Sequence, residues 1–287
     1  MLKQRIITAV VLLAILLPAL FYPSPVPFAA VTLVLIAAGA WEWGRLNGYG
    51  QKGALFMAFD CLALCAVSWK VGLVERPLPL LWSIGGAAWV LGGAWLLRGG
   101  VAGWPKVPKT VRVVAGLLAL WLAWLAVAQA RFIGVNFLLS VLVLIWVADV
   151  FAYFAGRTFG LKFTKGKLAP AISPGKSWEG VWGGMLGVVV LAVCWVAADT
   201  WLAAKVPSFY TRLASQGWWL LPIGVVFLAA MSVVGDLVES LVKRSAGAKD
   251  SSNLLPGHGG VLDRVDALLP TLPLAMMLTS LTSSLPK

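Results

Sequence analysis

The sequence predicts an all-α integral membrane protein, a bundle of about nine membrane-spanning helices in one domain. Hydrophobic residues make up 60% of the 287 positions and charged residues only 12%, and the mean hydropathy is +0.90. A water-soluble domain of this length cannot bury so much apolar surface. The apolar residues also occur in runs of roughly 20, the length that an α-helix needs to cross a bilayer. The chain is therefore expected to lie in a membrane.

The apolar runs are separated by short polar gaps that leave no room for a separate soluble domain. The first run follows Lys3 and Arg5 and so resembles a secretory signal peptide, but no small-residue cleavage site follows it. The aromatic and proline residues at 21–25 fit an interfacial anchor and a turn, and we expect a retained helix. One domain is expected over 1–287, with helices in 1–130 and the polar segments in 131–287. The nine runs lie at about residues 5–22, 25–44, 53–73, 78–97, 111–130, 133–156, 181–204, 217–242 and 261–284.

The net charge of +12 is distributed in a way that indicates a membrane orientation and not a nucleic-acid partner. If the N-terminus is cytoplasmic, most of the 23 Lys and Arg residues fall in inner loops or at inner helix ends. This is the asymmetry of the positive-inside rule. The sequence thus predicts a multi-pass protein of the cell membrane, inner or plasma, with its N-terminus in the cytoplasm.

A polar segment at 236–266 interrupts the apolar pattern with regularly spaced acids. Asp236 and Glu239 are three residues apart, as are Asp263 and Asp266, so each pair shares a helix face. Carboxylate oxygens are the ligands that Mg²⁺ prefers when it also binds phosphates. Solvated helix ends are the alternative interpretation. We expect the metal ligands to be Asp236, Asp263 and Asp266, with Asp149 as a weaker fourth.

The same segment is rich in cations and glycine. Lys243, Arg244, Lys249 and Arg264 are suited to phosphate contact. The glycines between them allow positive φ and a close approach of backbone N–H groups to an anion; they are Gly257, Gly259 and Gly260. The segment therefore predicts a phosphate site, although a basic membrane edge also orients a chain or attracts anionic lipid.

His258 is the only histidine in the chain. A lone histidine cannot build a His-rich zinc site. Proton transfer and a structural or substrate contact both remain open for it.

A second polar segment runs from 149 to 184 and also contains phosphate-binding residue types. Lys176 offers a cation, Ser173 and Ser177 offer hydroxyls, and Glu179 is placed to orient the lysine or a water. Gly175-Lys176-Ser177 does not make a Walker motif, because position 170, where that motif needs its first glycine, is proline. An ordinary basic loop before a helix is the alternative.

Together these two segments resemble the phosphatidate cytidylyltransferases, the CDP-diacylglycerol synthases. In the first, Ser240, Lys243-Arg244, Lys249-Asp250, His258-Gly259-Gly260 and Asp263-Arg-x-Asp266 fall at the spacings of that family. In the second, an Asp and a Gly-Arg are followed by Ser-Pro-x-Lys-Ser-x-Glu-Gly, where many members carry Thr at position 177 and a further Lys at position 175. The resemblance covers 149–184 and 236–266, whereas the first 130 residues match only as hydrophobic helices.

The resemblance implies transfer of CMP from CTP to phosphatidic acid, giving CDP-diacylglycerol and pyrophosphate, with Mg²⁺ and room for a second cation. It implies a site that faces the cytoplasm, and glycine pairs at 85–86 and 92–93 allow a homodimer. The residues expected to act in catalysis are Asp263, Asp266, Lys249, Lys176 and His258. Those expected to bind substrate are Ser173, Lys176, Ser177, Glu179, Arg157, Lys243, Arg244, Arg264, Gly259 and Gly260.

Two other functions use similar residues. A transporter or flippase for an anionic lipid or nucleotide also needs intramembrane acids and basic loops, and release of pyrophosphate with a metal requirement would exclude it. A different lipid enzyme, such as a CTP-dependent polyprenol kinase or a CDP-alcohol phosphotransferase, is the third class. The Asp-Gly-x-x-Ala-Arg motif of the phosphotransferases is absent from the sequence.

Overall fold

Nine helices long and apolar enough to cross a membrane are present in the computed structural model, which describes residues 2–283. The predicted bundle and its approximate spans are confirmed, although residue 284, the predicted end of the last span, lies outside the described part. The ninth span is broken at Asp266–Ala267 into two helices. The spanning elements are α1 (Leu2–Phe21), α2 (Val26–Leu46), α3 (Gln51–Lys70), α4 (Pro79–Gly103), α5 (Lys109–Ile133), α6 (Val135–Phe159), α7 (Trp178–Trp201), α9 (Leu220–Ser245) and α10 (Leu262–Val265) with α11 (Leu268–Ser283).

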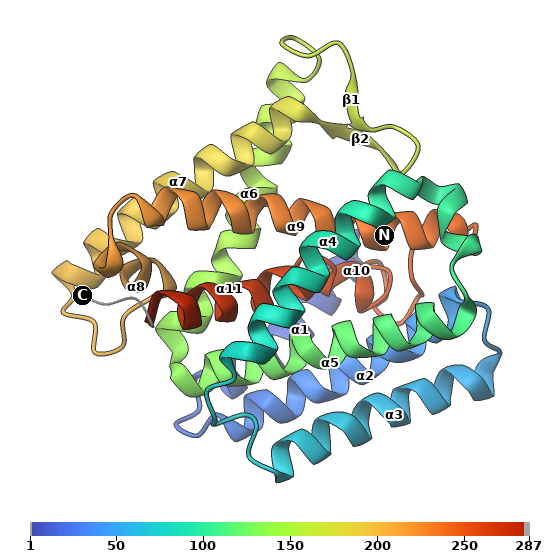
Figure 1. Cartoon of the computed structure of the whole chain (residues 1–287), viewed down its shortest axis with the longest axis horizontal. Helices are drawn as coiled ribbons and strands as arrows, with labels where there is room; N and C mark the ends of the chain where they lie inside the picture. The colour runs from blue at the N-terminus through green and yellow to red at the C-terminus, as the bar shows by residue number, and fades with distance from the viewer. Residues whose placement is uncertain (1, 284–287) are drawn as a thin grey trace.

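Short elements that the apolar pattern did not predict join these spans. A hairpin of β1 (Lys167–Ala169) and β2 (Ser173–Ser177) connects α6 to α7 and projects from the bundle (Figure 1). Lys167 pairs with Ser177, and Ala169 pairs with Ser173. The amphipathic helix α8 (Phe209–Gln216) connects α7 to α9, and a 3₁₀ turn, η1 (Trp104–Lys106), follows α4. The hairpin places part of the second polar segment beside the end of α9.

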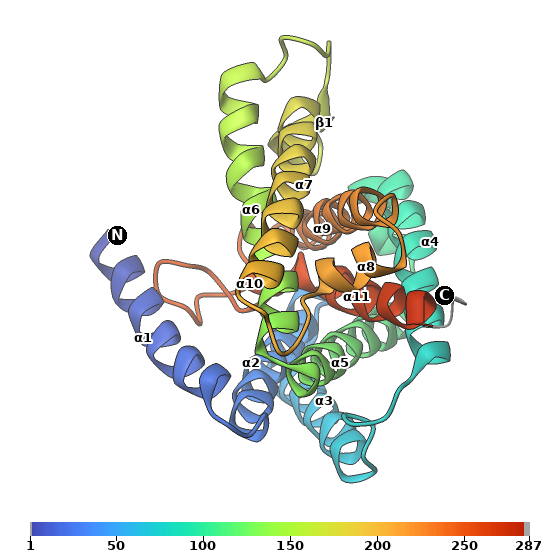
Figure 2. The same cartoon turned by 90° about the vertical axis from the view of Figure 1, so that its left-hand side faces the viewer.

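Helix α11 lies at the centre of the bundle. It packs against α4, α5 and α9, while α2 packs against α3 and α5 on the side away from the hairpin (Figure 1). Helix α1 lies at the edge of the molecule, with much of its length away from the other helices (Figure 2). Its packing partner is α2. Helix α11 is thus in contact with helices from both halves of the chain.

Glycines allow α6 and α7 to approach closely. A Cβ at Gly184 would lie 2.8 Å from the carbonyl oxygen of Ala148, and one at Gly180 would lie 3.0 Å from that of Ala152. Small residues at such positions are what close helix packing in a membrane requires. This close pairing forms one wall of the cavity described below.

The glycine pairs of α4 serve packing within the chain at three of four positions. Gly85 lies against Leu122 of α5, Gly86 against Met277 of α11, and Gly93 against Val234 of α9, whereas the space beside Gly92 is open. The two glycine pairs of α4 are therefore explained largely by helix packing within one chain, without a second copy of the protein.

Candidate active site

A cavity of about 350 Å³ lies where α6, α7 and α9 meet strand β2. It is lined by predicted site residues from both polar segments, which lie far apart in the sequence: Asp149, Arg157, Lys176, Ser177 and Asp236. The remaining lining is mostly small and apolar, and it includes Gly156, Gly180 and Gly184. The cavity therefore combines charged groups with space for a ligand.

An ion pair joins the two polar segments across this cavity. Nζ of Lys176, on β2, lies 2.5 Å from Oδ2 of Asp236, on α9, and both side chains are less than one-third exposed. The other oxygen of Asp236 accepts a hydrogen bond from the hydroxyl of Ser240 at 3.2 Å. Short charge-assisted bonds of this kind are among the stronger polar contacts in proteins. The lysine is thereby held beside the carboxylates.

Two further carboxylates lie within electrostatic range of Asp236. Asp149 of α6 interacts with both Asp236 and Lys176, and Asp266 interacts with Asp236 from the break in the ninth span. Oδ1 of Asp266 accepts a hydrogen bond from its neighbouring backbone N–H, that of Ala267. Across residues 2–283 no hydrogen bond or ion pair engages Oδ2 of Asp266 or the carboxylate of Asp149, so these oxygens remain able to bind a cation.

The donor set fits a hard divalent cation that keeps several other ligands. Within the described residues, no three acidic, histidine or cysteine side chains are close enough to hold a metal ion alone. Mg²⁺ commonly takes one or two carboxylates and completes its shell with water and phosphate oxygens. The oxygens of Asp236 and Asp266 meet that requirement.

Asp263, the third predicted metal ligand, lies in a different set of contacts. Its Oδ1 is 2.5 Å from Nζ of Lys243. Its Oδ2 accepts hydrogen bonds from the backbone N–H groups of Ser251 and Gly260, at 2.9 and 2.7 Å, and from the Ser251 hydroxyl. Lys243 also lies 2.6 Å from Glu239. Asp263 and Lys243 thus fix the ends of the segment between α9 and α10.

The predicted glycines and His258 lie in a tight turn of the segment between α9 and α10. Gly257 and Gly259 have φ of +78° and +85°, the conformation that glycine was expected to allow here. Gly260 is needed for space instead, because a Cβ there would collide with Ser251 and Glu42. Nδ1 of His258 is buried without a partner among the described residues.

Three cations of this segment, Arg244, Lys249 and Arg264, are exposed, whereas Lys243 is buried. Arg264 donates to the carbonyl of His258 at 2.7 Å, and Arg244 donates to the carbonyls of Ile172 and Ala248. Lys249 is exposed and forms no ion pair within residues 2–283. The contact of Arg244 with Ile172 is a second link between the two polar segments.

Ser177 and Glu179 organise the start of α7. The hydroxyl of Ser177 caps the helix by accepting the N–H of Gly180 at 3.2 Å. Oε1 of Glu179 accepts the backbone N–H and the hydroxyl of Thr164, each at 2.8 Å. Glu179 was expected to orient the lysine or a water, and in the structure its contacts are to the loop before β1.

Arg157 lines the cavity, whereas Ser173 is not among its lining residues. Ser173 is half-buried at the start of β2. Arg157 is exposed, lines the cavity and donates to the hydroxyl of Tyr153 at 2.9 Å. Its guanidinium is thus held by Tyr153 on the same helix.

Glu42 of α2 is a residue that the sequence reasoning missed. It is fully buried and accepts hydrogen bonds from the backbone N–H groups of Val261 and Leu262 at 2.9 and 2.7 Å. The hydroxyls of Ser251 and Ser252 also donate to it. Its presence as an acid inside an apolar segment was the available signal.

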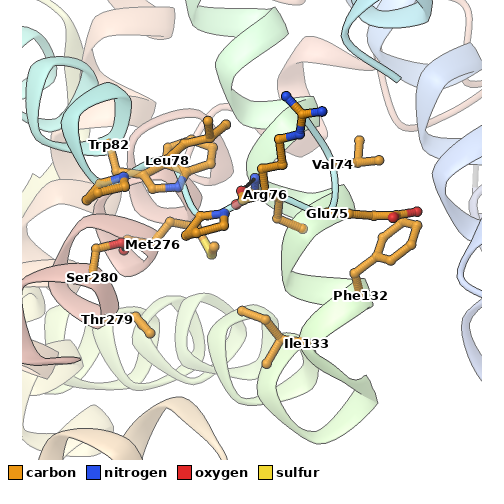
Figure 3. Close-up of a pocket in the computed structure, with 13 residues that line it drawn as sticks. Val74, Glu75, Arg76, Leu78, Trp82, Phe132, Ile133, Met276, Thr279 and Ser280 are labelled. Carbon is orange, nitrogen blue, oxygen red and sulfur yellow. Dashed lines mark hydrogen bonds between the residues drawn. The ribbon is translucent and has the colours of Figure 1, made fainter. Parts of the chain in front are cut away.

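A larger cavity, of about 490 Å³, lies at the other ends of α5 and α11, beside the loop 74–79 (Figure 3). Glu75 and Arg76 lie on its wall together with Trp82, Phe132 and Met276. The lining contains no residue of either polar segment, so the smaller cavity is the candidate active site.

Comparison with known proteins agrees with these motifs. A model of the cytidylyltransferase family matches residues 3–282. The chain is 39% identical to a phosphatidate cytidylyltransferase of Pseudomonas aeruginosa over 288 residues, covering 95% of each chain. It is 37% identical to one of Haemophilus influenzae, covering 95% of this chain and 96% of that one. It is 36% identical to one of Brucella abortus, with 93% and 89% covered.

Proposed function

The chain belongs to the cytidylyltransferase family, and we propose that it transfers CMP from CTP to phosphatidic acid, forming CDP-diacylglycerol and pyrophosphate for phospholipid synthesis. A phosphate oxygen of the lipid attacks the α-phosphorus of CTP, and the bond from that phosphorus to the β-phosphate oxygen breaks. The pyrophosphate leaves with the electron pair of that bond. Both reactants are anions, so the main task of the protein is to neutralise and align them.

The observation that carries this proposal is the ion pair of Lys176 and Asp236. It brings the lysine of the polar segment 149–184 beside an acid of the polar segment 236–266, at the wall of a cavity. Arg157, which lines the cavity, and the exposed Arg244 and Lys249 of the segment after α9 give further positive charge for an approaching triphosphate. The lysine would bind a phosphate oxygen and help hold the leaving group.

Mg²⁺ would be held by Asp236 and Asp266, with Asp149 close to them. When bound, the ion would neutralise phosphate charge and make the α-phosphorus a better electrophile. Lys176, which pairs with Asp236, would contact the phosphate next to that carboxylate. His258 would shape the nucleotide pocket through the turn that Arg264 holds.

The cavity lies near the ends of membrane helices, which suits a reaction between a lipid and a soluble nucleotide. The protein spans the membrane several times. We place it in the cell inner membrane with this end toward the cytoplasm, because the basic loops favour that side. CTP would enter from the cytoplasm and phosphatidic acid from the inner leaflet, so neither charge would cross the hydrocarbon. A homodimer would not be needed to complete this cavity.

The test is pyrophosphate release by the detergent-purified protein, with CTP and phosphatidic acid in mixed micelles, with and without Mg²⁺. Formation of CDP-diacylglycerol is followed in the same samples. Diacylglycerol of the same acyl composition serves as the control lipid, because it lacks only the attacking phosphate. We expect release only when CTP, phosphatidic acid and Mg²⁺ are all present. Absence of release by folded protein, with movement of lipid or nucleotide across vesicles, would support a transporter instead.

A further inference from the structure

We propose that Glu42, in the second membrane helix, is a positioning residue that holds the segment 251–262 in the geometry needed for cytidylyl transfer. This inference rests on the proposed function. It assigns a role in the site to the N-terminal part of the chain, in which no site residue was predicted.

The contacts of Glu42 join sequence positions more than 200 residues apart. Its Oε1 accepts the hydroxyl of Ser252 at 2.5 Å and the N–H of Val261 at 2.9 Å. Its Oε2 accepts the hydroxyl of Ser251 at 3.1 Å and the N–H of Leu262 at 2.7 Å. The two serines begin the segment, and the two backbone groups end it. One carboxylate therefore fixes both ends of the segment.

Ser251 is shared by Glu42 and Asp263. Its hydroxyl lies 2.9 Å from Oδ2 of Asp263, and the same oxygen accepts the N–H of Gly260. Gly260 leaves no room for a side chain between Ser251 and Glu42. Glu42, Ser251 and Asp263 thus form one compact connection, and a shift of Glu42 would be transmitted to Asp263 and the start of α10.

Helix α1 holds the opposite part of the same segment. Nε of Arg5 donates to the carbonyl of Gly257 at 2.8 Å, and the hydroxyl of Thr8 donates to that of Pro256 at 2.9 Å. These contacts lie next to His258. The N-terminal helices therefore support the segment both at its ends and at its turn.

The charge of Glu42 is stabilised by these donors and not by a cation. It is fully buried, and within residues 2–283 no Lys, Arg or His forms an ion pair with it. A buried carboxylate without a cation needs several N–H or O–H donors. The segment supplies three that serve Glu42 alone, and the single proton of the Ser251 hydroxyl is shared between Glu42 and Asp263. The carboxylate and the folded segment are therefore interdependent.

Glu42→Gln tests this dependence with little change in volume. The amide keeps one acceptor oxygen but places an NH₂ group before one serine hydroxyl and one backbone N–H. The hydroxyl can rotate to accept from the NH₂ group, but the N–H of Val261 or Leu262 loses its acceptor. Glu75→Gln is the matched control, because Glu75 is exposed and lies at the other end of the bundle. Ser252→Ala removes a single donor and is used if Glu42→Gln does not fold.

Hydrogen–deuterium exchange of the backbone at 251–262 is measured without substrates, together with kcat and KM in mixed micelles. In Glu42→Gln we expect faster exchange at Val261 and Leu262. Because small displacements of aligned groups slow a reaction strongly, we also expect kcat to fall about 10–100-fold while KM for phosphatidic acid changes less than about threefold. Ser252→Ala should change both in the same direction and by less, and Glu75→Gln should match the wild type.

Unchanged exchange at 261–262 in folded Glu42→Gln would overturn the proposal. So would a loss of activity that follows only the folded fraction, with the kcat of the folded enzyme preserved. If the wild-type protein shows no cytidylyl transfer, the proposed function fails, but the exchange measurement still decides whether Glu42 holds the segment.

Discussion

Replacing Lys176 by methionine should strongly reduce activity, because it removes the charge that connects the two polar segments. The ammonium group lies 2.5 Å from Asp236, and the two side chains are 26% and 32% exposed. A hydrogen bond from this ammonium group to a charged phosphate oxygen in the transition state contributes about 1.5–3 kcal/mol. Since about 1.4 kcal/mol corresponds to a factor of ten, kcat/KM should fall about 10–150-fold, and further if the lysine also binds the leaving pyrophosphate.

The assay is CDP-diacylglycerol formation in mixed micelles at several CTP concentrations. Lys165→Met is the matched control, since Lys165 is exposed just before the same hairpin and forms no ion pair within residues 2–283. A double-mutant cycle with Asp236→Asn measures the coupling between the two side chains, which we expect to be about 1–3 kcal/mol. Folded Lys176→Met with activity within about threefold of the control would refute the reasoning.

Three further substitutions test other parts of the structure. Asp263→Asn should lower activity at least about 100-fold and also lower the unfolding midpoint, because it leaves the buried Lys243 with one fewer carboxylate. A folded protein with a near wild-type rate would contradict this. Gly235→Ala should cost about 1–3 kcal/mol of stability and raise the Mg²⁺ concentration needed for half-maximal activity, because the added Cβ would lie 2.5 Å from the carbonyl oxygen of Asp266. An unchanged Mg²⁺ titration would argue against Asp266 as a ligand. Asp199→Asn should lower stability by about 1–3 kcal/mol and leave kcat intact, since its hydrogen-bond partners are Asn136 at the start of α6 and Ser208 and Thr211 at the start of α8. A fall in kcat at unchanged stability would contradict this purely structural role.

The membrane spans could be predicted because their information is local. Runs such as 135–159 and 220–245 contain enough apolar residues to specify a spanning helix without knowledge of their neighbours. The meeting of Lys176 with Asp236 was also foreseeable in outline, since both polar segments were expected at one side of the membrane. The distance between Lys176 and Asp236 depends on the close packing of α6 and α7 at their glycines. That packing could not be predicted from the sequence alone.

The part that could not be predicted depends on contacts between distant segments. Glu42 is an acid in an apolar helix, which marks it as unusual, but its four donors lie 209–220 residues further along the chain. The β1–β2 hairpin was missed for a different reason. Its strands are short and contain Lys, Ser, Pro and Gly, so they lack the alternating pattern that indicates a strand.

The position of Glu42 has a consequence for how the protein is made. Helix α2 enters the membrane early in synthesis, whereas the serines and backbone groups that satisfy its carboxylate are translated more than 200 residues later. Until the ninth span inserts, this acid must remain near water at the end of its helix, because an unpaired charge is costly inside hydrocarbon. A chain that stops before residue 251 would hold eight apolar helices and still carry an unsatisfied acid among them. Completion of the last span would therefore be the step that both closes the bundle and makes the enzyme competent.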